Sequence, residues 1–223
     1  MLLHNYNARG CKVSLLEDPI EKKRRQAPAA EPVLLCHSLE ALLEAGLGDG
    51  AELAIWPRQL PPEIGAAFEM LDCSSFEDIR FTGPPRDVFQ RAWVWLSQAH
   101  WPALVRQTIL GDVKAAFACV RDIDADCTFR LEYVTDDACR KFHKDDTDFR
   151  LITTYFGPGT EWRVERAGEE PGNIGEMKPH EVGMLLGQRC SLANCVLHRS
   201  PPIEGSGQAR LVLVLDFERP GYC

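Results

Sequence analysis

The sequence lacks three features that would assign it to a specialised class of protein. No apolar run approaches the ~20 residues that a membrane-spanning helix requires. The opening residues, MLLHNYNARGCKVSLLEDP, contain no basic segment followed by a long apolar one, so no secretory signal is evident. The nine cysteines, an odd number, include no CxxC pair. Together these absences predict a soluble cytoplasmic protein with mostly free thiols and no membrane partner.

An excess of positive charge is also absent. The 25 basic residues are outnumbered by 33 acidic ones, which gives a formal net charge of −8. Nucleic-acid binding needs a basic face, so we expect no nucleic-acid partner. The one basic cluster, EKKRR, runs into an Ala/Pro-rich segment, and we interpret it as part of a solvated tail or linker.

The length of 223 residues suits one domain with an N-terminal extension, or two small domains that share a core. We expect residues 1–32 to be a weakly ordered tail, 33–123 a helical region and 124–223 a β-rich core. Helices are predicted in SLEALLEAGL, with Ser38 as N-cap, in PPEIGAAFEML and in RDVFQRAWVWLSQAHW. The segment WPALVRQTILGDVKAAFACVRDI predicts one broken helix or two, with the break at Gly111 and Asp112. Four tryptophans are expected to pack in the core or between layers: Trp56, Trp93, Trp95 and Trp101.

After residue 123 the hydrophobic period changes from helical to alternating. The segment CTFRLEYV places Phe129, Leu131 and Tyr133 on one face, and three polar residues on the other, as in a half-buried strand. Further strands are predicted around 140–143 and in RLITTYF, EWRVER, VGMLLG, NCVLHR and ARLVLVLDF, separated by turns such as GPGT and EGSGQ. Many short strands without intervening helices favour an antiparallel barrel or jelly roll.

The segment FHKDDTDFR carries a candidate metal chelate. On a strand, His143 and Asp145 would share a face, whereas Asp146 would point to the opposite one. We expect Lys144 and Asp148 to point to solvent or to support the ligands.

A third ligand can come from His198, which follows the apolar strand NCVL and so lies at a strand end. His180, in a turn before a strand, is expected at the surface. Two histidines and one carboxylate leave about half of an octahedral sphere open, which is typical of non-haem Fe(II) oxygenases. Cys139, four residues before His143, can approach the same pocket on a regular strand and favour zinc; the simpler interpretation is a small buried side chain.

An arginine strengthens the hypothesis of a site. Arg210 opens the last strand, whose faces are both apolar, so its guanidinium needs an anion. A protein carboxylate can supply that anion, and so can a dicarboxylate cosubstrate.

The order of these motifs resembles the double-stranded β-helix family of Fe(II)/2-oxoglutarate-dependent oxygenases, especially its prolyl-hydroxylase-like branch. The matching features are His143-x-Asp145, RLITTYFGPGT, KPHEVGMLLG, His198 and Arg210. From about residue 40 onward, the wording CRKFHKD, RLITTYFGPGTEW and HRSPP resembles still more closely a bacterial family known only as a domain of unknown function. The resemblance implies an α+β fold, with a helical N-terminal half packed on a C-terminal double-stranded β-helix, a cupin-like jelly roll.

The same resemblance implies a role for each matching residue. His143, Asp145 and His198 would bind Fe(II) and form the catalytic centre, and Arg210 would hold the distal carboxylate of 2-oxoglutarate. Arg150 and Tyr155 would add polar contacts to cosubstrate or substrate. The implied reaction couples decarboxylation of 2-oxoglutarate to succinate with oxidation of a C–H bond in a small molecule or a protein side chain. GPGTEW departs from the hydroxylase pattern, which puts the substrate side of the pocket in question.

Two alternatives stay open at the level of sequence. A non-catalytic cupin-like protein of zinc or iron homeostasis would use the same ligands without oxidation chemistry. A buried structural network around an empty barrel is the other, although burying these charges without partners costs several kcal/mol, by order of magnitude. The sequence leaves a homodimer open, and RAGEEPGNIGEMKPH is either a lid or an exposed hairpin connection.

Overall fold

The computed structural model describes residues 31–47, 51–73, 76–120, 125–190 and 195–218. Four helices lie at Leu39–Leu47 (α1), Pro62–Glu69 (α2), Pro85–Gln98 (α3) and Ala103–Cys119 (α4). Strands of the first half lie at Val33–Leu35 (β1), Leu53–Trp56 (β2) and Ile79–Gly83 (β3). Those of the second half lie at Asp126–Val134 (β4), Phe149–Phe156 (β5), Glu161–Val164 (β6), Gly175–Glu176 (β7), Val182–Leu186 (β8), Val196–Arg199 (β9) and Arg210–Glu218 (β10).

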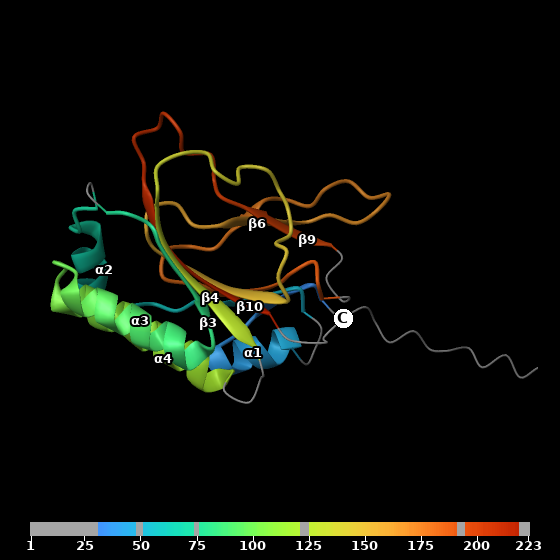
Figure 1. The fold of residues 1–223 in the computed structure, drawn as a ribbon. Helices are drawn as coiled ribbons and strands as arrows, with labels where there is room; N and C mark the ends of the chain where they lie inside the picture. Colours follow the sequence, from blue (N-terminus) through green and yellow to red (C-terminus); the bar gives the residue numbers. More distant parts are fainter. Residues whose placement is uncertain (1–30, 48–50, 74–75, 121–124, 191–194, 219–223) are drawn as a thin grey trace, which may run out of the picture.

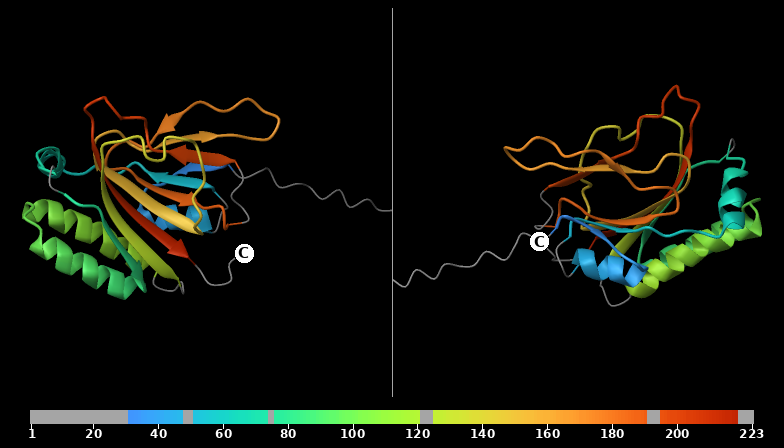
Figure 2. Two further views of the ribbon diagram at one scale, coloured as in Figure 1. Left: turned by 45° about the horizontal axis from the view of Figure 1, so that its top comes forward. Right: turned by 180° about the vertical axis from the view of Figure 1, so that it is seen from behind.

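The strands form two sheets. The main sheet has seven strands in the order β1-β2-β8-β5-β10-β4-β3, and the small sheet has three in the order β7-β6-β9. In Figure 1 the main sheet lies between α1, α3 and α4 on one side and the small sheet on the other. The two further views show the same layers, with the β6–β7 hairpin extending away from the body (Figure 2). The two sheets face each other, as in the expected jelly roll, and the space between them is the interior of the barrel.

The alternation along the central strands separates two faces of the main sheet. Phe129 and Leu131 of β4, Leu151 of β5, and Leu213 and Leu215 of β10 all belong to the large apolar core shared with the helices. Their neighbours in sequence point into the barrel, because successive side chains of a strand alternate between faces. The predicted alternation in β4 is therefore correct, and the face that reads as polar is the inner wall of the barrel.

The helices follow the predicted start signals. The Ser38 hydroxyl accepts a hydrogen bond from the Ala41 amide at 3.2 Å, which confirms the expected N-cap of α1. Pro62 lies in the first turn of α2, as predicted, where a missing amide proton costs nothing. Helix α3 begins at Pro85, one residue before the predicted segment.

The break predicted at Gly111 and Asp112 is wrong, because α4 runs through both residues. A glycine inside a helix costs only about 1 kcal/mol relative to alanine, and the packing of α4 outweighs it. Val105, Ile109 and Val113 are fully buried on one side of the helix. Asp112 is held by bonds to Arg58 and Tyr155.

The region 33–123, predicted to be helical, also contributes β1, β2 and β3 to the main sheet. These strands are three to five residues long, too short for alternation to reveal them. Their position depends on long-range partners: β2 pairs with β8, and β3 pairs with β4. The predicted tail at residues 1–32 lies almost wholly outside the described residues.

The tryptophan predictions differ in outcome. Trp95 and Trp101 pack edge to face, with ring centroids 5.6 Å apart, as layer-packing residues. Trp93 is 52% exposed on α3, so its assignment to the core is wrong. Across the residues that the structure describes, no helix is both long and apolar enough to span a bilayer.

Candidate metal centre

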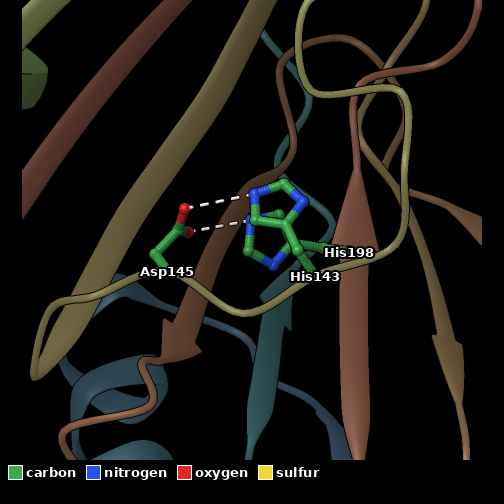
Figure 3. Close-up of side chains that lie close together, drawn as sticks. All are labelled: His143, Asp145 and His198. Carbon is green, nitrogen blue, oxygen red and sulfur yellow. Dashed lines mark ion pairs between the residues drawn. The ribbon is translucent and has the colours of Figure 1, made fainter.

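Three side chains predicted as ligands converge inside the barrel. Each of His143, Asp145 and His198 offers one ligand atom, and these atoms all lie within 4.8 Å of one another. Figure 3 shows the two imidazoles side by side, both facing the carboxylate of Asp145. This separation suits three ligands of a single ion.

The prediction that His143 and Asp145 share one face of a strand is wrong. Residues 139–148 form no strand, and His143 makes only an isolated β-bridge to His198. The His143 amide donates to the His198 carbonyl at 2.9 Å, and the His198 amide donates to the His143 carbonyl at 3.0 Å. Backbone pairing of a loop with β9, and not the common face of one strand, therefore brings the two imidazoles together.

The backbone carbonyl of Lys141 sets the tautomer of His143. Nδ1 lies 2.8 Å from the carbonyl oxygen of Lys141, which can only accept, so Nδ1 carries the proton. In the neutral ring Nε2 then carries the lone pair; it lies 3.3 Å from Oδ1 of Asp145, and this contact raises the pKa of His143. Histidine ligands of metals are commonly oriented by such a bond from the other ring nitrogen.

His198 is 5% exposed, and its Nε2 lies 2.8 Å from Oδ2 of Asp145. Neither of these two buried atoms has a hydrogen bond of normal geometry with a described residue, although Oδ2 of Asp145 is also in ion-pair contact with Arg150. Burial lowers the pKa of His198, which favours the neutral, ligating form of the imidazole. Two buried electron-pair donors that face each other in this way fit a cation bound between them.

Asp145 is held from the opposite side by Arg150. The guanidinium of Arg150 lies 2.5 Å from Oδ2 of Asp145 and also bonds to Asp216, at 2.6 and 3.1 Å. Burial by itself raises the pKa of Asp145, but the contacts with His143, His198 and Arg150 outweigh it and hold the pKa well below its usual range. The carboxylate is therefore ionised, as a metal ligand must be.

Sequence reasoning missed Glu52, which links both ligand segments. Its carboxylate accepts bonds from the amides of Cys195 and Val196 at the start of β9, and from Nζ of Lys144 at 2.9 Å. Burial opposes ionisation, yet these bonds lower the pKa of Glu52 below its ordinary value. No local motif marks this glutamate; only its burial, at 6% exposure, identifies it.

Arg210 lies where the prediction placed it, in the same cavity as the two histidines. Its side chain is buried at 1% exposure and donates to hydroxyls of Ser200, Thr154 and Thr160 at 3.2, 3.0 and 2.8 Å. No carboxylate of the described residues lies within salt-bridge distance of its guanidinium. Burial lowers its pKa to about 10, and more distant glutamates offset only part of that effect. Arg210 is thus a buried cation surrounded by neutral hydroxyls.

Tyr155 does not reach the cavity. Arg150 and Tyr155 are five positions apart on β5, so their side chains point to opposite faces of the sheet. Tyr155 is fully buried in the helix-side core, where its hydroxyl donates to Asp112 at 2.8 Å and its ring stacks on Phe68. The predicted contact of Tyr155 with a cosubstrate is therefore wrong, whereas Arg150 contacts the site through Asp145.

Other predictions around the site also change. Cys139 is exposed, with a φ of 60°, so it is neither a buried filler nor a member of the ligand cluster, although it lines the rim of the cavity. Asp148 is buried at 3% exposure, which excludes the solvent-facing alternative of the two predicted for it. His180 is half-buried, and its Nε2 donates to the Tyr155 carbonyl at 2.8 Å. Of the segment considered as a lid, residues 166–174 form the connection between β6 and β7 and the rest contains β7 and the turn after it; none of its residues lines the cavity.

Comparisons with solved structures identify the fold. A dioxygenase for auxin oxidation from rice superposes with a TM-score of 0.51 at 13% identity, covering 86% of this chain and 84% of that one. Dioxygenase for auxin oxidation 1 from Arabidopsis thaliana, in a 2-oxoglutarate complex, superposes with a TM-score of 0.50 at 12% identity, covering 85% and 93%. At these identities the similarity shows the fold alone. It supports the oxygenase-like β-helix inferred from the motifs.

The sequence comparisons assign the family. No curated protein matches the sequence. A family model matches residues 38–216, most of the chain, and agrees with the expectation of an uncharacterised family. The chain belongs to the family described as "Protein of unknown function (DUF1826)".

Proposed function

We propose that this protein is an Fe(II)/2-oxoglutarate-dependent oxygenase of the hydroxylase type, acting on a small molecule or a protein side chain. The observation that carries the proposal is that the two histidines of a two-histidine, one-carboxylate cluster line the same cavity as a buried arginine that has no acidic partner among the described residues. Neither feature explains the other. A dicarboxylate that reaches from the metal to Arg210 accounts for both.

The donor set favours iron over a closed zinc site. Structural zinc sites use four protein ligands, often with cysteine, whereas a histidine-histidine-carboxylate face leaves positions open. Cys139, the residue that would favour zinc, lies outside the cluster. When bound, Fe(II) and 2-oxoglutarate would supply the activation of dioxygen and the electrons for oxidation of a C–H bond.

The residues of this chain would bind and orient the metal and the cosubstrate, and would exclude water from the cavity. Asp145 would be held by Arg150 and the tautomer of His143 by the Lys141 carbonyl, so the ligand atoms need little reorganisation. Arg210 would take the distal carboxylate through a planar pair of donors, with hydroxyls beside it to complete the contact. Val212, Val214 and Ile152 line the same cavity and would keep water from it.

The test is an anaerobic titration of the purified full chain with Fe(II) and 2-oxoglutarate. We expect a weak metal-to-ligand charge-transfer band that is lost in His143→Ala and kept in His100→Ala, whose histidine is exposed on the described surface. The absence of a band in the native protein, together with no 2-oxoglutarate binding, would falsify the proposal.

The same protein samples test the alternative, a metal-binding protein without turnover. It predicts tight Zn(II) binding by the same three residues and no succinate under any condition. Metal content after native purification, measured beside succinate release with Fe(II), 2-oxoglutarate and oxygen, separates the two. Succinate formed without added substrate also counts for the oxygenase, since uncoupled turnover needs 2-oxoglutarate, oxygen and a reductant but no substrate.

A further inference from the structure

The loop that carries two of the three metal ligands is held to the small sheet by a ring contact as well as by its backbone. His143 forms an isolated antiparallel bridge with His198, through two backbone hydrogen bonds of 2.9 and 3.0 Å. This bridge adds the loop to the free edge of β9 and places Phe142 opposite Arg199. Successive side chains alternate between faces, so the imidazole of His143 faces the barrel and the ring of Phe142 lies on the outer face of the small sheet.

Two guanidinium groups lie over the ring of Phe142. The central carbon of the Arg163 guanidinium, on β6, is 4.3 Å from the ring centroid, and that of Arg199, on β9, is 4.4 Å from it. Arg163 projects from the outer face of the small sheet, since its neighbours Trp162 and Val164 pack in the barrel interior. A cation within about 6 Å of a ring centroid is attracted by the quadrupole of the ring. Phe142 therefore joins the loop to both strands.

The positive charges of the two guanidinium groups are offset by carboxylates of the same sheet. Arg163 pairs with Glu165 at 2.5 Å, and Arg199 pairs with Glu161 at 2.6 Å. Arg199 also donates to the backbone carbonyl of Arg140, in the loop itself, at 3.4 Å. Both glutamates belong to β6 or to the residue after it, so the small sheet itself orients the two cations that contact the ring.

We propose that Phe142, held by Arg163 and Arg199, is a positioning residue of the metal centre: it fixes the backbone at His143 and so the place of its imidazole in the ligand cluster. Residues 139–148 form no strand, so the bridge is not continued by a ladder that would hold this backbone. Because Phe142 directly precedes His143, a shift of its ring moves the peptide from which the imidazole projects. The inference rests on the metal centre of the proposed function but not on its oxygen chemistry.

The test measures Co(II) affinity of the full chain by competition with a chelator, together with the visible d–d spectrum of the Co(II) protein. Phe142→Leu keeps an apolar side chain but removes the ring. We expect it to weaken Co(II) binding about 5- to 30-fold and to alter the spectrum, since both cation–π contacts form only when the loop is docked. Phe142→Tyr, which keeps the ring, should bind Co(II) as the native chain does.

A second variant changes the cation instead of the ring. Arg163→Met keeps an apolar stem and removes one of the two guanidinium groups, so it should weaken Co(II) binding about 2- to 5-fold. Arg163 is chosen because Arg199 also lines the cavity of the metal centre, whereas Arg163 does not.

Phe81→Leu is the matched control. The ring of Phe81, on β3, makes the same kind of contact with Arg91 of α3, at 4.5 Å. This variant should lower the melting temperature of the metal-free protein and leave Co(II) affinity and the spectrum unchanged. A purely structural role of Phe142 predicts that same pattern for Phe142→Leu.

The role of Phe142 and the proposed function fail in different ways. The positioning role is overturned if the native chain binds no Co(II), if Phe142→Leu keeps native affinity and spectrum, if Phe142→Tyr binds as weakly as Phe142→Leu, or if Phe81→Leu weakens binding equally. A native chain that binds Co(II) but not 2-oxoglutarate contradicts the oxygenase alone, and the same variants still decide the role of Phe142.

Discussion

The two faces of the main sheet are made by the same strands but serve different purposes. Along β10, the side chains of Leu211, Leu213, Leu215 and Phe217 pack against the helices. Those that alternate with them face the barrel: Val212 and Val214, with Arg210 before them and Asp216 after them. Apolar burial on the helix side stabilises the fold by roughly 25 cal/mol for each Å² removed from water. Charges on the barrel side contribute little net stability, because desolvation opposes their pairing. Stability thus comes mainly from one face, and the capacity for chemistry from the other.

The largest expected effect comes from the helix side. Phe129→Ala removes a fully buried ring stacked on Phe81 and should lower the free energy of unfolding by about 3–5 kcal/mol. Metal affinity of the fraction that remains folded should not change. Urea unfolding measures the first and metal titration the second. Trp93→Ala, at an exposed ring on α3, is the matched control, with an effect within about 0.5 kcal/mol.

The next effect comes from the barrel side, where a substitution should weaken ligand binding and leave stability unchanged or higher. Arg210→Met should weaken binding of 2-oxoglutarate on the order of 100-fold, because charge-assisted hydrogen bonds to the carboxylate are lost. Its free energy of unfolding should stay the same or rise, because the variant no longer buries an uncompensated cation. Arg189→Met, at an arginine paired with Asp146 and Glu218 on the outside, should alter neither. A large loss of stability in Arg210→Met would break the contrast between the faces.

A smaller effect is expected where the sheets meet. Glu52→Gln cannot pair with Lys144 or accept at both oxygens from β9, so the two ligand segments lose their common anchor. We expect metal affinity to fall about 10-fold, as for other changes one step removed from a ligand. Metal titration against a competing chelator measures this. Glu44→Gln, at an exposed residue of α1, serves as control, and equal affinities in the two variants would count against the anchoring role.

The smallest effect returns to the helix side. Tyr155→Phe removes the bond to Asp112, which Arg58 still holds, and should lower the free energy of unfolding by about 1 kcal/mol at neutral pH. Burial, with the charge of Asp112, raises the pKa of Tyr155 well above its ordinary value. The unfolded chain then loses this proton near pH 10 while the folded chain keeps it. The stability from this group is therefore present below pH 10 and lost as the pH rises further.

Urea unfolding at pH 8, 9.5 and 11 measures that alkaline loss. The decline should be less steep in Tyr155→Phe than in the native chain, since the variant has no phenol to titrate at this position. Parallel declines in the two proteins would show that other groups, such as the buried thiols, cause the loss.

Much of the site could be predicted because each of its residues has a side chain whose chemistry indicates a role without knowledge of the others. Histidines and a carboxylate close to strand ends, and an arginine heading an apolar strand, need partners wherever they fold. The divergence of Arg150 and Tyr155 was also available from the sequence, because their odd spacing on one strand places them on opposite faces. Glu52 could not be found in this way. Its partners, Lys144 and Cys195, are about 90 and 140 positions away, and nothing in its neighbourhood marks it as buried.

The sequence by itself determined the local structure of the chain: the helix starts at Ser38 and Pro62 and the alternation of β4. These depend on interactions within a few residues, which any short window contains. Only the tertiary structure decided that β1, β2 and β3 complete the sheet and that the loop around His143 docks on β9. Both depend on backbone hydrogen bonds between distant segments, and such bonds are nearly independent of the side chains that flank them.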